Sequence, residues 1–219
     1  MFLDQGFASP YYGPNHAAFR DRVRKFVDTE ITPYANEWIK KGQTYPKDLH
    51  MKAYEAGIGG ILFPAEYGGT KPKDFDAFYE IILWDELFRS ASGSTLGQLA
   101  INSMALPPII QYGSKKIKDL VLKDVIQGKK FCSLMISEPT AGSDVASIKT
   151  TAERIGDFYK VNGLKKWITG GHMADFFTTA VRTGSEGGKG LSLLLIPRNL
   201  AGISVRKMET MFGTLIIED

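Results

Sequence analysis

The chain has 219 residues, of which 43% are hydrophobic and 23% charged, and its 27 basic and 24 acidic residues give a net charge of +3. This composition is that of a globular protein of one or two domains with a sizeable core. The balanced charge argues against a dedicated nucleic-acid-binding protein. The single cysteine, Cys132, excludes an internal disulfide and fits a reducing compartment.

The N-terminal sequence, MFLDQGF, lacks the basic segment and apolar stretch of a secretory signal. No apolar run approaches the roughly 18 residues that a bilayer span requires. We therefore expect a soluble cytoplasmic protein without a membrane partner. The mitochondrial matrix is the alternative, after loss of a transit peptide, although none is visible in the sequence.

The first half of the chain carries a helical pattern. An apolar stripe at helical spacing begins the first helix, formed by Phe19, Val23, Phe26 and Val27. Pro33 should break or kink this helix, because proline removes a backbone donor. A short helix is expected over residues 46–56, and the glycines that follow mark its end.

Three more helices are expected before residue 130. Residues 74–89 are apolar on most sides, as in a helix inside a bundle. Residues 97–112 form a weakly polar helix that two adjacent prolines should disturb. Ser114 is a plausible N-cap for the next helix, which Gly128 should end. Its expected buried stripe consists of Ile117, Leu120, Val121 and Val125.

After Lys130 the pattern becomes strand-like. The expected strands cover residues 131–135, 148–155, 158–161, 164–169, 175–182, 191–197, 203–208 and 214–219. Two-residue turns are expected at Gly156-Asp157 and Asn162-Gly163.

Helices followed by strands, without alternation of the two, predict an α+β protein. We expect an all-α domain over residues 1–129 and a β-barrel or sandwich domain over residues 130–219. A strand at the end of the sequence suggests that this second domain is incomplete; a closing terminal strand is the alternative.

Several familiar site motifs are absent. No Gly-x-Gly-x-x-Gly follows a strand, and the glycine-rich loop (residues 184–190) lacks the spacing of a phosphate-binding P-loop. His16, His50 and His172 lie far apart without ligand spacing, so no metal site is expected. No residue is assigned a catalytic role from local sequence.

Two segments remain as candidate binding elements: the Ser-Glu-Pro loop (residues 136–147, ISEPTAGSDVAS) and the Trp segment (residues 165–171, KKWITGG). Ser137 and Thr169 each offer a hydroxyl and a backbone N–H at a strand end. Gly142 and Ser143 could let the backbone approach an anion and present N–H donors to it. Trp167 offers a flat face to a ring system.

Together these groups could hold a planar heterocycle joined to a pyrophosphate, as in flavin nucleotides. The alternative is that the hydroxyls lie on a sheet surface, the tryptophan is a core residue, and the Gly-Ser-Asp sequence is an ordinary turn.

The Ser-Glu-Pro loop closely resembles the signature loop of the acyl-CoA dehydrogenases, and the Trp segment resembles their second flavin segment. Residues 63–69, FPAEYGG, resemble the family's Pro-x-x-Tyr-Gly-Gly loop, and residues 155–163, IGDFYKVNG, are similar to its hairpin. The resemblance covers nearly the whole chain in order. It implies a helical domain, a middle β-domain and a C-terminal helical bundle, and the chain would end before that bundle.

The resemblance implies FAD as the cofactor. Ser137 would hydrogen-bond the pyrimidine side of the flavin ring, Thr169 would lie near N5, and Ser143 would face phosphate or the acyl-CoA substrate. Met135 stands where the family usually has a smaller residue. The implied cofactor-binding residues are Leu134, Met135, Ile136, Ser137, Gly142, Ser143, Trp167, Ile168 and Thr169.

The implied reaction is the α,β-dehydrogenation of an acyl-CoA thioester, with FAD as the hydride acceptor. The family's catalytic base lies in the C-terminal bundle and nothing here matches its motif, since Glu138 belongs to the signature loop. The chain alone is therefore expected to be inactive. Implied partners are acyl-CoA, an electron acceptor such as an electron-transfer flavoprotein, and further copies of the complete chain in a dimer or tetramer.

Two other functions remain open at this stage. Acyl-CoA oxidases and nitroalkane oxidases are related flavoenzymes that share these loops. A non-catalytic flavin-fold module, acting in an assembly or on nucleic acid, is the alternative from another class, and the mild positive charge gives it little support.

Overall fold

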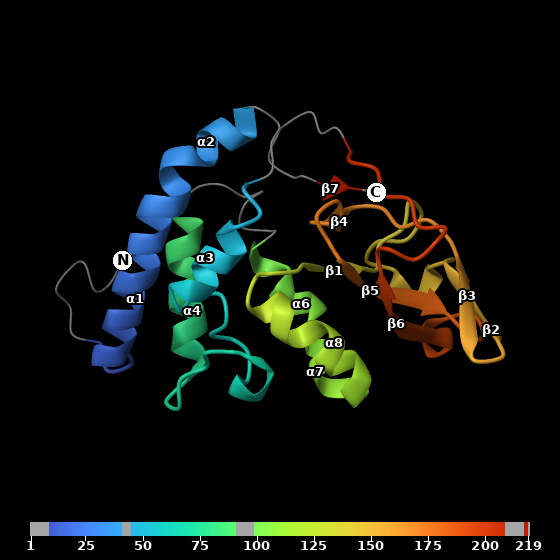
Figure 1. Cartoon of the computed structure of the whole chain (residues 1–219), viewed down its shortest axis with the longest axis horizontal. Coiled ribbons are helices and arrows are strands. Elements are labelled where there is room, and N and C mark those ends of the chain that lie inside the picture. The colour runs from blue at the N-terminus through green and yellow to red at the C-terminus, as the bar shows by residue number, and fades with distance from the viewer. Residues whose placement is uncertain (1–8, 41–44, 91–98, 209–216, 219) are drawn as a thin grey trace.

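The computed structural model describes residues 9–40, 45–90, 99–208 and 217–218. In this part of the chain a group of helices precedes the strands, and Figure 1 shows the helices on one side of the molecule and the sheet on the other. The order confirms the expected α+β class, with a helical domain followed by a sheet-containing domain.

The first helix continues past the position where a break was expected, but its geometry changes. Helix α1 (Pro14–Phe26) runs into a π-helical turn at Val27–Ile31, and α2 (Thr32–Lys40) follows. Pro33 lies just after the π-helical turn. Because proline cannot donate a hydrogen bond to the preceding turn, the helical geometry is disturbed directly before it.

The other helices largely follow the expected pattern. Asp76 caps one of them by accepting a hydrogen bond from Phe78 N at 2.9 Å, and Ser114 Oγ accepts from Ile117 N at 3.4 Å at the start of another. The helix expected over residues 97–112 is divided where its two prolines begin. These elements are α3 (Leu49–Glu55), a 3-10 turn (Ala65–Tyr67), α4 (Ala77–Phe88), α6 (Asn102–Ala105), α7 (Pro107–Tyr112) and α8 (Lys115–Ile126).

The predicted buried stripe of α8 is wrong at one position. Leu120 is 50% exposed, whereas the buried residues of this helix are Val121, Leu122, Val125 and Ile126. At 100° per residue, Leu120 falls opposite the centre of that buried face. The helix ends at Ile126, and Gly128 follows the C-cap Gln127 with a positive φ of 72°, which favours glycine.

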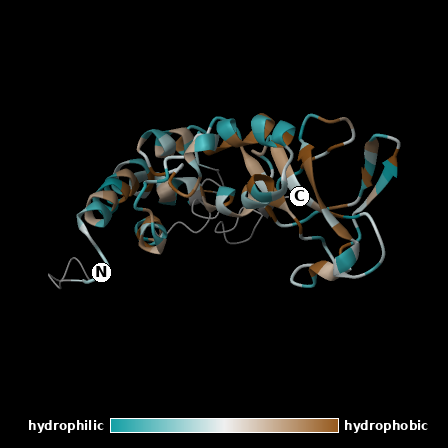
Figure 2. Ribbon diagram, turned by 90° about the horizontal axis from the view of Figure 1, so that it is seen from below, coloured by the Kyte–Doolittle hydropathy of each residue, from teal (hydrophilic) through white to brown (hydrophobic). Residues whose placement is uncertain are grey.

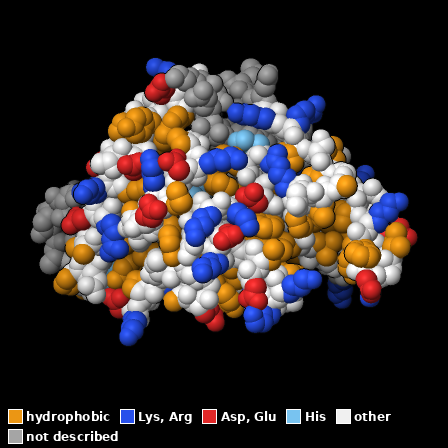
Figure 3. Space-filling view, in the orientation of Figure 1, with side chains coloured by type: hydrophobic (Ala, Val, Ile, Leu, Met, Phe, Trp, Pro, Cys, Tyr) orange, Lys and Arg blue, Asp and Glu red, His pale blue; other side chains and the backbone are white. Residues whose placement is uncertain are grey.

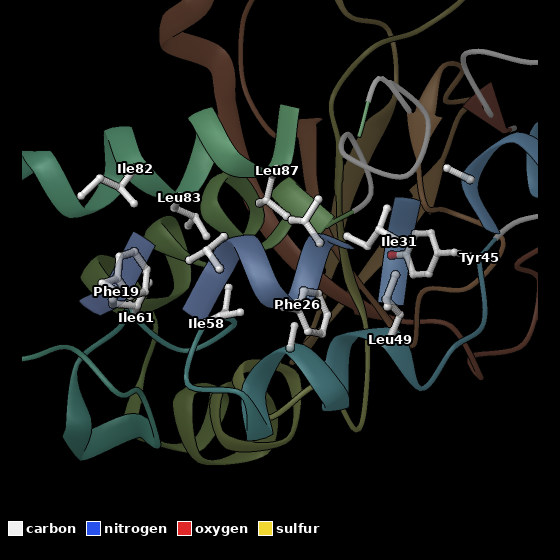
Figure 4. Packing of buried hydrophobic residues seen from close by; sticks show 14 of the residues in the cluster. Phe19, Phe26, Ile31, Tyr45, Leu49, Ile58, Ile61, Ile82, Leu83 and Leu87 are labelled. Atoms are coloured by element: carbon white, nitrogen blue, oxygen red, sulfur yellow. The ribbon is translucent and has the colours of Figure 1, made fainter. Parts of the chain in front are cut away.

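The core of the helical domain lies between α1, α3 and α4 (Figure 4). The stripe predicted for α1 is buried there, from Phe19 to Val27. Apolar side chains of α4 such as Ile82 and Leu87 pack against it. In Figure 2 hydrophobic and hydrophilic residues alternate along the helices.

A fully buried carboxylate joins α1 to α4. Glu86 accepts hydrogen bonds from Arg20 at 2.8 Å, from Arg24 at 2.9 Å and from Arg89 at 2.8 Å. Burial by itself would raise the pKa of Glu86, but the hydrogen bonds and charges of the arginines lower it. The carboxylate therefore stays charged and satisfied inside the bundle.

In the described part of the chain the strands form a five-stranded sheet and a two-stranded one. The strands are β1 (Cys132–Met135), β2 (Thr151–Ile155), β3 (Phe158–Asn162), β4 (Ile168–Thr169), β5 (Phe176–Arg182), β6 (Leu191–Pro197) and β7 (Ile217–Glu218). In the larger sheet the order is β1-β5-β2-β3, with β6 also paired to β5. The β1–β5 pairing is parallel, and β2–β3 and β5–β6 are antiparallel.

One of the two predicted hairpin turns is present. Ile155 pairs with Phe158 across the Gly156-Asp157 turn, and Gly156 has the positive φ that such turns require. The turn predicted at Asn162-Gly163 is wrong, since neither residue has a positive φ. A Cβ on Gly163 would lie 2.3 Å from the hydroxyl oxygen of Thr150, so this glycine serves a close contact and not a turn.

Three predicted strands are shorter or missing. The strand expected over 148–155 begins only at Thr151, and the one over 164–169 is reduced to the two residues of β4. Residues 203–208 form no strand. Of the terminal strand, 214–216 and 219 lie outside the described residues, and β7 pairs antiparallel with β4.

The helices and the sheet share a second core. It contains Leu106 and Val125 from the helices and Cys132 and Phe176 from the sheet. The Thr178 hydroxyl donates to the carbonyl of Ala105 at 2.8 Å across this contact. Strand β1, which leads into the Ser-Glu-Pro loop, is thereby anchored against the helical domain. None of the helices in the described ranges has the length and apolar character of a membrane span.

Candidate flavin site

The two segments singled out in the sequence lie side by side. The Ser133 hydroxyl on β1 donates to the carbonyl of Thr169 at 2.9 Å, and the backbone N–H of Lys166 donates to the carbonyl of Ser137 at 2.9 Å. These bonds align the exit of β1 with the Trp segment. The residues expected to contact the flavin ring from both segments are therefore neighbours.

A buried ion pair lies behind this contact. Lys165 Nζ donates to Glu138 Oε1 at 2.9 Å and to the carbonyl of Ile136 at 2.8 Å. The Glu138 carboxylate also accepts from the backbone N–H groups of Lys149 at 2.6 Å and Thr150 at 2.9 Å. The pair joins the start of the Ser-Glu-Pro loop, the residues just after its end, and the Trp segment.

The Glu138 carboxylate is ionised at neutral pH. Burial alone would raise the pKa of Glu138, but hydrogen bonds from Thr150, Lys149 and Lys165 hold it at about 2. Burial lowers the pKa of Lys165 from its ordinary value, and the carboxylate opposes that change. Because the Glu138 oxygens are occupied by three donors, the residue is a structural anchor and is not placed to accept a substrate proton.

The span Gly142–Ser143 is exposed and held at both ends. Before it, Glu138 and Ala141 form an antiparallel bridge. After it, Ser147 Oγ donates to Asp144 Oδ2 at 2.6 Å within a 3-10 turn over Val145–Ser147. A Cβ on Gly142 would meet no atom within 4 Å, so open space lies in front of this backbone.

Trp167 has an unusual backbone. Its φ is 66°, and among the described residues no other residue except glycine has a positive φ. Its side chain is 47% exposed. A bulky residue in this conformation costs on the order of 1–2 kcal/mol. Lys166 Nζ stands 4.9 Å from the ring centroid. A strained backbone that presents an indole to solvent favours a role in contacting a ligand.

The remaining predicted residues differ in where their side chains lie. Leu134 packs against the core shared with the helices, and Ile136 against a small cluster beside Ala141. Met135 and Ile168 line a cavity of about 760 Å³ next to the sheet. Ser137 and Thr169 are half-buried where the two segments meet.

The histidine beside the site is neutral. Burial, followed by the charges of Lys207, Arg198 and Lys47, lowers the pKa of His172 to about 4. Its loop is held by Arg198, which donates to the carbonyl of Gly171 at 3.1 Å and to that of His172. The described residues contain no group of acidic, histidine or cysteine side chains that could hold a metal ion.

Sequence reasoning missed Lys165 as a site residue. Its one signal is a pair of lysines at the start of a segment that otherwise carries no charge. Its partner Glu138 lies 27 positions away in sequence, so only the folded chain reveals the pair. The left-handed conformation of Trp167 carried no sequence signal, because tryptophan rarely adopts it.

Comparisons with known proteins agree with this geometry. The family profile "Acyl-CoA dehydrogenase, N-terminal domain" matches residues 13–129, and "Acyl-CoA dehydrogenase, middle domain" matches residues 133–217. An acyl-CoA dehydrogenase of Emericella nidulans is 37% identical over 222 residues, covering 94% of this chain and 50% of that protein.

Two further relatives agree. The mitochondrial isobutyryl-CoA dehydrogenase of Dictyostelium discoideum is 34% identical, covering 92% of this chain and 49% of that protein. The crystal structure of acyl-CoA dehydrogenase from Geobacillus kaustophilus has a TM-score of 0.85 at 32% identity, over 96% of this chain and 56% of that one. The chain thus spans about half the length of the curated relatives it matches. With profiles matched over most of its length, it belongs to the acyl-CoA dehydrogenase family.

Proposed function

We propose that this chain provides the flavin-binding part of an FAD-dependent enzyme that dehydrogenates an acyl-CoA thioester between its α and β carbons. One observation carries the proposal: the Ser-Glu-Pro loop and the Trp segment are hydrogen-bonded together through Ser137 and Lys166. The contact between the two segments brings hydroxyls, backbone N–H donors and an exposed indole close together.

The chemistry of these groups fits a flavin nucleotide. An isoalloxazine ring is flat and rich in hydrogen-bond acceptors, which matches the hydroxyls of Ser137 and Thr169 and the exposed ring of Trp167. A pyrophosphate is bound by exposed backbone N–H groups, and the span Gly142–Ser143 is exposed, with open space where a Cβ on Gly142 would lie. We assign the nine residues predicted from the sequence to this site on that basis.

Bound FAD would supply the hydride acceptor. The hydroxyls of Ser137 and Thr169 and the indole of Trp167 would hold and orient it, and the Glu138–Lys165 pair keeps the two segments together.

The two carboxylates of the Ser-Glu-Pro loop are engaged in structure. Glu138 pairs with Lys165, and Asp144 accepts from Ser147 Oγ. A base for the α-proton must reach the α-carbon with a free carboxylate. We therefore propose that neither residue is the base, and that the chain on its own binds flavin without turning over acyl-CoA.

The same proposal extends to partners and domains. We assign the helical domain to residues 1–129 and the middle domain to 130–219. The substrate is an acyl-CoA, the electron acceptor is an electron-transfer flavoprotein, and the complete protein is a homo-oligomer. The name of one relative, isobutyryl-CoA dehydrogenase, favours a short branched acyl group as the first substrate to test.

An affinity measurement tests the flavin assignment. Trp167→Ala should weaken FAD binding at least about tenfold, as read from quenching of flavin fluorescence, because it removes the ring contact. The matched control is Phe158→Ala, since Phe158 is also an exposed aromatic residue but lies in the β2–β3 hairpin. Equal affinities for both variants and the wild type would contradict the assignment.

A further inference from the structure

Arg182 makes an unusual set of contacts at the end of β5. Its guanidinium donates to Ala146 O at 2.6 Å and twice to Ile148 O, at 3.0 and 3.1 Å. It also donates to Ser185 O at 2.6 Å and to Gly187 O at 3.1 Å. One side chain thus holds four backbone carbonyls from two loops.

The first two carbonyls lie in the last turn of the Ser-Glu-Pro loop and directly after that loop. Ala146 lies inside the 3-10 turn that closes the exposed span Gly142–Ser143, and Ile148 follows that turn. The near end of the span is fixed by the bridge at Glu138. Arg182 therefore fixes the far end of the span, so that the span is held at both ends.

The other two carbonyls belong to the glycine-rich loop. This loop is closed on itself, because Gly184 N donates to Gly190 O at 3.0 Å. A Cβ on Gly190 would lie 1.8 Å from Ser185 O, so only glycine permits this closure. The tight fold keeps the carbonyls of Ser185 and Gly187 on the guanidinium.

Arg182 forms no ion pair with a carboxylate of the described residues, whose ion pairs involve other side chains. Carbonyl dipoles orient the guanidinium but do not neutralise it. A positive charge next to the Ser-Glu-Pro loop favours an anion there.

We propose that Arg182 is a positioning residue that fixes the Gly142–Ser143 span for the pyrophosphate of a flavin nucleotide. It acts through the backbone of the Ser-Glu-Pro loop, which it joins to the glycine-rich loop. The inference rests on the proposed function. It predicts an effect on the phosphate end of the cofactor and none on the isoalloxazine end, which Trp167 and Thr169 would hold.

Hydrogen exchange tests the anchoring step without any cofactor. In Arg182→Met, amide exchange over residues 142–147 and 184–190 should rise at least about tenfold, because four carbonyls lose their donors. The matched control is Arg154→Met, since Arg154 also donates to a carbonyl, Gly156 O at 3.1 Å, but in the β2–β3 hairpin. Exchange in the helices gives the internal reference for a folded variant.

Binding of two flavins tests the positioning step. Arg182→Met should weaken FAD at least about tenfold and leave riboflavin, which lacks phosphate, within about twofold of the wild type. Arg182→Lys retains the charge but offers fewer donors in a different geometry, so its FAD affinity should be intermediate. Arg154→Met should change neither affinity.

The outcomes separate the two proposals. Unchanged loop exchange in Arg182→Met, or equal weakening of FAD and riboflavin, overturns the role of Arg182. A wild-type chain that binds neither flavin contradicts the proposed function and the cofactor part of this inference, while the exchange experiment still decides whether Arg182 anchors the loops.

Discussion

Replacing Lys165 with methionine should destabilise the protein strongly, because it leaves a buried carboxylate without its cation. The side chains of Lys165 and Glu138 are 5% and 4% exposed. Removing one partner of such a pair costs about 3–5 kcal/mol. The carbonyl of Ile136 loses its Nζ donor as well, which adds to the cost.

The same cost has a defined pH dependence. The folded pKa of Glu138 is about 2, below the ordinary value of about 4.3. A depressed carboxyl pKa stabilises the fold above the unfolded pKa, and this stability of about 3 kcal/mol is lost as the pH falls from about 5 to 2. In Lys165→Met that dependence should become smaller, because the carboxylate keeps only its backbone donors.

The assay is urea unfolding followed by tryptophan fluorescence and circular dichroism at pH 7, for Lys165→Met, Glu138→Gln and the double variant. The double variant should be more stable than the sum of the single losses predicts, by at least about 1 kcal/mol. The matched control is Lys130→Met, whose exposed pair with Asp124 should contribute only about 0–1 kcal/mol. A loss below about 1 kcal/mol for Lys165→Met, or additive single losses, would refute the reasoning.

Three further predictions concern other parts of the chain. Glu86→Gln should lower the free energy of unfolding by about 3–5 kcal/mol, since three arginines then lose their carboxylate; an effect below 1 kcal/mol in urea unfolding would exclude the buried network. Gly69→Ala should unfold the protein or lower its Tm sharply, because a Cβ would lie 1.9 Å from Phe63 O. The control Gly142→Ala should leave the Tm nearly unchanged and weaken the binding of FAD. A normal Tm for Gly69→Ala would contradict the backbone contact. Burial lowers the pKa of His50 to about 4 from about 6.5, so stability should fall as the pH drops from about 7 to 4, and thermal unfolding of His50→Phe should show less of that loss.

The sequence predicted elements whose determinants are local. The apolar period predicted α4 and α8, Ser114 was predicted as the N-cap of α8, and Gly156 was predicted in the turn between β2 and β3. Errors arose where a distant contact decided the outcome. The Asn162-Gly163 pair has turn chemistry, but Gly163 is needed for its approach to Thr150.

The candidate site divides in the same way. Ser137, Ser143 and Trp167 were predicted from chemistry and resemblance, because the binding properties of a hydroxyl or an indole can be recognised from the residue and its neighbours in sequence. The anchors Lys165 and Arg182 were not predicted, since each acts on residues that only folding brings near. Figure 3 shows hydrophobic side chains gathered on the surface of the sheet half. Which side chains meet there likewise depends on which strands pair.

The most direct measurement is the visible absorption spectrum of the purified chain after incubation with excess FAD and desalting. The wild type should retain the flavin bands, and a variant carrying Ser137→Ala and Trp167→Ala should lose them while keeping the wild-type circular dichroism. A colourless wild type, or flavin retained equally by the double variant, would show that the Ser-Glu-Pro loop and the Trp segment do not hold the cofactor.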